Sequence, residues 1–205
     1  MEGPPYLVEA LGGTTPYSTG TKVWRSARGH RLGKKRGGDM ALSEQYLEDD
    51  LHPIDIVEHL AAHHEWDFDR ISDEQIAMAV EGQWRTYSIT LAWSAFDETL
   101  RLICTFEMEP PEEKLAGLYE LLNLVNDQCW AGAFTYWAEQ QLMVYRYGLV
   151  LAGGQDVSAE QVDTLISAAV LSAERYYPAL QLLVWGDRTP QEALQVAIAE
   201  AYGHA

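Results

Sequence analysis

The sequence predicts an α+β fold in which helices pack on an antiparallel β-sheet. Segments that alternate apolar and polar residues follow one another in pairs across short turns, which is the pattern of antiparallel hairpins. Segments with apolar residues three and four positions apart, typical of amphipathic helices, stand before, between and after these pairs. No internal repeat is visible, so we expect a single folded domain.

The first helix is expected to begin near Pro53, because proline suits the first helical position and Asp55 and Glu58 lie near the positive helix end. A short extended piece is expected at 66–71. The next segment, Gln75 to Glu81, alternates as a strand does, although its alanines and glutamates also suit a helix. The predicted buried stripe of the first helix comprises Ile54, Val57, Leu60, Ala61 and His64.

Two clearer strands follow at 84–93 and 100–108, joined by a short turn at 95–98. Pro110 and Pro111 end the second strand and open a helix, because proline removes a ladder donor but is tolerated in a first helical turn. The apolar stripe of this helix is Leu115, Leu118, Tyr119, Leu122 and Val125.

A second hairpin, formed by 130–138 and 142–151, is the most aromatic part of the chain. Its second strand is apolar on both faces, whereas a sheet with helices on one side needs only one apolar face. We therefore expect a further covering layer or a partner on the second face. Tyrosine and tryptophan are enriched in interfaces, so the candidate partner or dimer surface comprises Trp137, Tyr145 and Tyr147, with ordinary core packing as the alternative.

Two helices are expected after this hairpin. Ser158 and Gln161 form a capping box for a long helix, which Pro178 is expected to kink or break. A final helix is predicted from the tetrapeptide that begins at Thr189, which combines a capping threonine, a proline and a glutamate, and it ends at Gly203.

A change of charge at Met40 divides the chain. Residues 1–40 hold seven basic and three acidic residues, about +4, whereas residues 41–205 hold seven basic and 28 acidic residues, about −21. The glycine-rich head has no apolar period and cannot offset its ordering entropy by burial. We expect 1–40 to be a disordered extension and 41–205 to be the folded domain. A translation start at Met40, or a basic arm that grips an acidic surface, are the alternatives.

The charge and the apolar pattern exclude several classes of partner. The net negative charge of residues 41–205 disfavours binding to nucleic acid and to anionic membranes. No stretch approaches the length of a membrane span, and no signal peptide is apparent, so a cytoplasmic location is expected. Cys104 is expected to be a buried thiol; a disulfide with Cys129 is not demanded by the sequence.

No constellation of residues predicts catalysis, so we expect a protein without enzymatic activity, metal or cofactor. His59 and His63 lie four residues apart on the first helix and could share a metal with His52 or His64. A second group of ligands is missing, so partly solvated histidines at a helix end are the favoured interpretation. A small-molecule or metal-dependent enzyme that uses the His59/His63 helix remains the alternative hypothesis.

The sequence from Leu51 to Tyr202 resembles the YbjN family of bacterial sensory transduction regulators. The resemblance rests on the run Leu122-Leu-Asn-Leu-Val-Asn126, on Leu142-Met-Val-Tyr-Arg-Tyr147 in the aromatic hairpin, and on the Ser158-capped helix. It implies a fold like that of type III secretion chaperones and no catalytic residues. Asn123 and Asn126 match the family run, and we expect them to bond backbone groups at the end of their helix.

The resemblance and the residue patterns together predict a regulatory or chaperone-like protein that acts through protein–protein contacts, as a homodimer. A basic protein client is a further expected partner, because the domain is strongly acidic.

Overall fold

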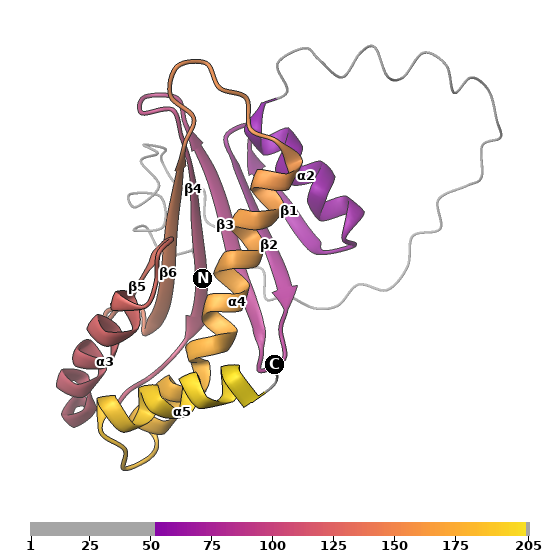
Figure 1. Ribbon diagram of the computed structural model, residues 1–205. Helices are drawn as coiled ribbons and strands as arrows, with labels where there is room; N and C mark the ends of the chain where they lie inside the picture. The colour runs from indigo at the N-terminus through magenta and orange to yellow at the C-terminus, as the bar shows by residue number, and fades with distance from the viewer. Residues whose placement is uncertain (1–51, 204–205) are drawn as a thin grey trace, which may run out of the picture. The chain divides into compact units, whose positions relative to one another are not determined.

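The computed structural model describes residues 52–203, and side chains as far as Ala199. Helices lie on one face of a six-stranded antiparallel sheet with strand order β1-β2-β3-β4-β6-β5 (Figure 1). This confirms the predicted α+β class. The proposed division between residues 1–40 and 41–205 lies outside the described residues. The helices are α2 (Pro53–His63), α3 (Leu115–Asp127), α4 (Ala159–Val184) and α5 (Pro190–Gly203), with a 3-10 turn η1 (Glu112–Lys114).

Each strand of the sheet pairs with the strand next to it in the sequence, except at one place. There β4 pairs with β6 rather than with β5. Every strand pair is antiparallel, as alternating segments joined by short turns predict. Residues 75–81 are a strand, which resolves the choice between strand and helix. The strands are β1 (Asp67–Ser72), β2 (Gln75–Glu81), β3 (Thr86–Ser94), β4 (Thr99–Glu107), β5 (Ala133–Trp137) and β6 (Leu142–Val150).

The hydrophobic core lies between the helices and one face of the sheet. Alternate residues of each inner strand point into it, so that the buried side chains follow the period of two that the sequence displays. The thiol of Cys104 is among them, and burial raises its pKa to about 12. Both cysteines are free, and Cys129 is half-buried. The sheet contributes most of its core through Ile76, Met78, Tyr87, Ile89, Leu91, Leu100, Leu102, Phe106, Met143 and Tyr145.

On the first helix, His64 differs from its predicted place. Ile54, Val57 and Ala61 are buried, but His64 is exposed because it forms the C-cap, where the helix has already ended. Its Nε2 atom lies 3.1 Å from Oδ1 of Asp163 on α4, and its ring stacks on Trp66.

The long helix α4 differs from the sequence prediction at Pro178. It runs unbroken from Ala159 to Val184, with Pro178 inside it, so of the predicted kink or break, the break does not occur. A proline removes one helical hydrogen bond and crowds the preceding turn. Side chains on both sides of Pro178, including Tyr177 and Ala179, are buried in the core, and this packing holds the helix together. The capping boxes at Ser158 and Thr189 are present as predicted.

Helix α4 is also attached to a turn of the sheet. The carboxylate of Glu174 accepts hydrogen bonds from the backbone N–H groups of Gln83 (2.9 Å) and Trp84 (3.3 Å) between β2 and β3. Beside it, the guanidinium of Arg85 lies over the rings of Phe106 and Tyr177. A carboxylate that accepts two backbone donors has a structural task, so this cluster fixes the helix to the hairpin.

Candidate functional site

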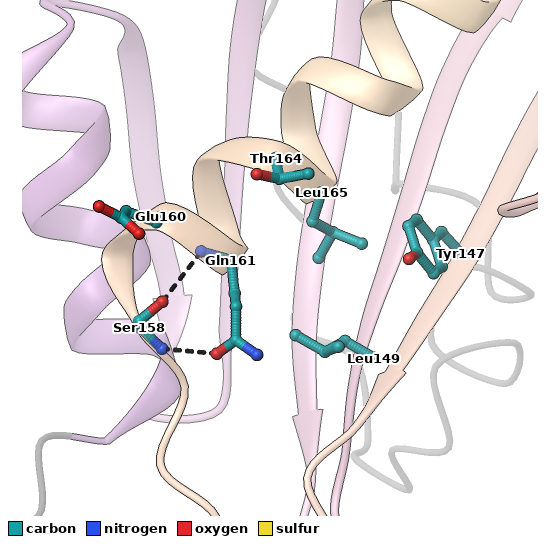
Figure 2. A pocket seen from close by; sticks show the side chains of 7 residues that line it. All are labelled: Tyr147, Leu149, Ser158, Glu160, Gln161, Thr164 and Leu165. Carbon is teal, nitrogen blue, oxygen red and sulfur yellow. Dashed lines mark hydrogen bonds between the residues drawn. The ribbon is translucent and has the colours of Figure 1, made fainter.

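A cleft opens between the last residues of β6 and the first two turns of α4. Its cavity volume is about 290 Å³. Leu149 on the strand and Leu165 on the helix point toward one another across it, and Glu160 lies at its rim (Figure 2). The lining residues are Tyr147, Leu149, Ser158, Glu160, Gln161, Thr164 and Leu165.

The capping box of α4 shapes the floor of this cleft. Gln161 N–H donates to Oγ of Ser158 (3.1 Å), and Ser158 N–H donates to Oε1 of Gln161 (2.9 Å) (Figure 2). These bonds satisfy two backbone donors at the start of the helix and fix the direction in which the chain enters it. Ser158 and Gln161 are therefore held in place, while Leu149 of the strand and Leu165 of the helix supply the apolar lining.

The structure does not bring the three predicted interface residues to one surface. Trp137 pairs with Leu142, whereas Tyr145 and Tyr147 are on the opposite, helix-covered face of the sheet. Tyr145 is fully buried, and its hydroxyl donates to the carbonyl oxygen of Ala131. Burial raises the pKa of Tyr145. Of the three residues, Tyr147 alone lines the cleft, and a partner or dimer surface that includes them stays a prediction.

The opposite face of the sheet carries apolar side chains near β6, including the half-buried Trp137. Ile103 and Val144 are buried there, Leu142 is half-buried and Val150 is 65% exposed. No helix within residues 52–203 packs on this face. The expected second layer or partner therefore stays a prediction. At the end of this face, Thr99 pairs with both Ser94 and Val150, and the turn between β3 and β4 presents a fully exposed Phe96.

Asn126 has a tertiary task rather than the expected local one. Its Nδ2 group donates to the carbonyl oxygen of Phe134 (3.0 Å), and Phe134 N–H donates to its Oδ1 atom (2.7 Å). The side-chain amide thus occupies the outer edge of β5 as a neighbouring strand would. Asn123 is exposed. The sequence could not distinguish the two, because the contact depends on where β5 lies.

The histidines of α2 do not gather into a site. Nδ1 of His59 lies 2.6 Å from the carbonyl oxygen of Asp55, and His63 contacts the ring of His64 edge-on. Among residues 52–203, no three His, Cys, Asp or Glu side chains are placed to hold a metal ion together. Nor does any helix in that range have the length and apolar character needed to cross a bilayer.

A second cleft lies between the end of α4 and α5. It has a cavity volume of about 420 Å³ and is lined by Pro178, Gln181, Leu182, Trp185, Gly186 and Val196. Trp185 is 58% exposed beside it. The sequence predicted neither cleft, although it pointed to Tyr147, because the first cleft requires β6 and α4 to meet and the second requires α5 to pack against the end of α4.

Comparison with known proteins gives a family match over the same elements. Residues 53–182, from α2 almost to the end of α4, match the model of YbjN, described as a putative bacterial sensory transduction regulator. The chain belongs to the YbjN family. This confirms the resemblance noted in the sequence. No curated protein matches the chain significantly.

Two solved structures are similar to the chain at low sequence identity. The crystal structure of YbjN, a putative transcription regulator from E. coli, has 13% identity and a TM-score of 0.42, with 75% of this chain and 93% of that chain covered. The structure of the HopA1–SchA chaperone–effector complex has 14% identity and a TM-score of 0.41, with 60% and 89% covered.

Proposed function

We propose that this YbjN-family protein is a cytoplasmic, non-enzymatic regulator that acts by binding other proteins, and that it does so as a homodimer. The observation that supports binding is the end of the sheet at β6, where an apolar-walled cleft lies on the helix side and an exposed Val150 lies on the opposite face, with a fully exposed Phe96 in the nearby β3–β4 turn. Large apolar side chains exposed in this way are characteristic of interaction surfaces.

Charge indicates the chemistry of a client. Residues 41–205 contain 28 acidic and seven basic side chains. The resulting negative electrostatic field attracts a cationic partner. A basic protein or segment is therefore the client that the domain suits best. Its association should weaken as salt is added, because salt screens exposed charges.

Sedimentation velocity of the full chain at tens of micromolar tests the homodimer. We expect a dimer for the native protein and a monomer for Phe96→Glu, because a carboxylate in an apolar contact is costly to bury. The control is Ala95→Glu, which adds the same charge to the same exposed turn and should remain dimeric. A monomeric native protein would contradict this part of the proposal.

Affinity capture from the source cytoplasm tests the client. We expect one basic protein to be retained in stoichiometric amount at low salt and released at high salt. If no protein is retained at any salt concentration, the proposed function is wrong.

A further inference from the structure

One half of β6 has no neighbouring strand on its outer side. Strand β5 pairs with Leu142 to Arg146, from Trp137↔Leu142 to Ala133↔Arg146, and ends there. Strand β4 pairs with the whole of β6, as far as Thr99↔Val150. Residues 147–150 therefore form a sheet edge of four residues, about 13 Å long at the usual rise.

The backbone groups that face this edge can be identified from the bonds at both ends of β6. Leu151 N–H donates to the carbonyl oxygen of Glu98 (2.7 Å), and Gln141 C=O accepts from Met108 N–H (2.9 Å), so odd-numbered residues turn toward the β4 side. Even-numbered residues turn outward, because bonding directions alternate along an antiparallel strand. Within the described chain, the backbone groups of Gly148 and Val150 have no strand to pair with.

The edge and the cleft adjoin each other. Tyr147 and Leu149 lie between the outward-facing residues of β6, and both line the cleft under α4. A strand added to the edge would alternate its side chains between the two faces of the sheet. Every second side chain would enter the cleft against Leu149 and Leu165, and the others would lie beside Val150.

The surroundings of the edge carry more negative than positive charge. Arg101, opposite Gly148 on β4, is paired with Asp97 at 2.5 Å, and Arg146 precedes the edge on β6. Between Tyr147 and Leu165 the chain holds Asp156, Glu160 and Asp163, and no Lys or Arg. A second copy of the chain would bring the same carboxylates to its partner, and like charges repel. A segment with lysine or arginine would be complementary.

We propose that residues 147–150 and the cleft beneath α4 bind an extended segment of another protein, which adds a strand to the sheet and alternates apolar with basic side chains. Backbone pairing would supply affinity and the cleft would select the side chains. This inference rests on the proposed function, because it names the site and the class of partner through which the regulator would act.

A fluorescein-labelled peptide of alternating lysine and valine, seven residues long, tests the site by anisotropy with the full chain. Val150→Pro removes an outward N–H donor at an exposed position, and we expect it to weaken binding at least tenfold. Val150→Thr keeps the donor and the branched shape and should bind like the native protein. A peptide with glutamate in place of lysine should not bind.

A second variant tests the same site without altering β6, in case Val150→Pro misfolds that strand. Thr164 is exposed in the cleft wall, so Thr164→Arg should fill the cleft, add positive charge beside a basic segment and weaken binding at least tenfold without unfolding the helix. Leu171→Arg, at an exposed position farther along α4, should have no effect.

Binding unchanged by both Val150→Pro and Thr164→Arg would overturn the site while leaving a protein-binding function intact. No binding of the peptide up to about 1 mM would overturn the inference as well. Chain self-association that Val150→Pro abolishes, without peptide binding, would assign the edge to a second copy instead. Failure of the proposed function itself would be recognised separately, as a chain that retains no protein at all.

Discussion

The two edges of the sheet differ in how their outward-facing backbone groups are protected. At one end, β1 carries charged side chains at Asp67, Asp69 and Arg70, and its pairing with β2 shifts register between Arg70 and Ser72. At the other end, residues 147–150 of β6 are uncharged and regularly paired with β4. Charges and irregularities on an edge strand discourage the addition of another strand. The difference indicates that β1 is a protected edge and that the end of β6 is a receptive one.

Attachments to helices reinforce the contrast. Nη1 of Arg70 lies 2.5 Å from Asp55 and 2.7 Å from Glu58, both on α2. On the outer edge of β5, the backbone of Phe134 is likewise bonded by the Asn126 amide. Within the described chain, residues 147–150 of β6 have no such attachment on their outer side.

The largest expected effect is at the point where the chain enters β5. Gly132 has φ +73°, and a Cβ there would overlap the Tyr145 ring and the carbonyl oxygen of Arg146. Gly132→Ala should lower the free energy of unfolding by about 3 kcal/mol, since buried atoms must shift and the backbone is strained. Urea denaturation measures this.

The control is Gly154→Ala, at φ +71° with open space around the site. It should cost about 1 kcal/mol, the strain alone. Equal losses in both variants would mean that β5 does not depend on the close approach at Gly132.

A smaller loss is expected when β5 is released from α3. Asn126→Ala leaves the N–H and C=O of Phe134 without their side-chain partner and should cost about 2 kcal/mol. Asn123→Ala, in the same helix at an exposed position, should change stability by less than about 0.5 kcal/mol. Thermal melting would distinguish them. Similar melting temperatures for the two variants would show that the edge of β5 is not held by Asn126.

The smallest effect on stability is expected at β1. Arg70→Met removes a partly exposed ion-pair cluster, so the melting temperature should fall slightly at low salt and not at all at high salt. Hydrogen bonds to Glu58 and Asp55 raise the pKa of Arg70. A raised pKa means that the contribution is complete below the unfolded pKa and is lost only as pH rises through the folded value. The fall in melting temperature caused by Arg70→Met should therefore be the same at pH 7 and pH 9. If that fall disappears by pH 9, the ion pairs of Arg70 do not stabilise the protein as described.

The sequence predicted the elements well because they depend on local chemistry. Alternation predicted β3 and β4, and capping residues such as Ser158 and Thr189 located the helix starts. The break predicted at Pro178 does not occur, because tertiary packing outweighs one lost helical hydrogen bond. Which face Tyr145 and Trp137 occupy follows from strand register, and the cleft needs β6 and α4 to meet. Neither is encoded in spacing along the chain.

Amide hydrogen exchange, followed by NMR residue by residue, tests the receptive edge most directly. In the free full chain, the amides of Gly148 and Val150 should exchange far faster than that of Val144, which faces β5. Adding the lysine–valine peptide should slow exchange at Gly148 and Val150 and leave β1 unchanged. Slow exchange at both amides in the free protein, or no slowing when the peptide is bound, would contradict the account.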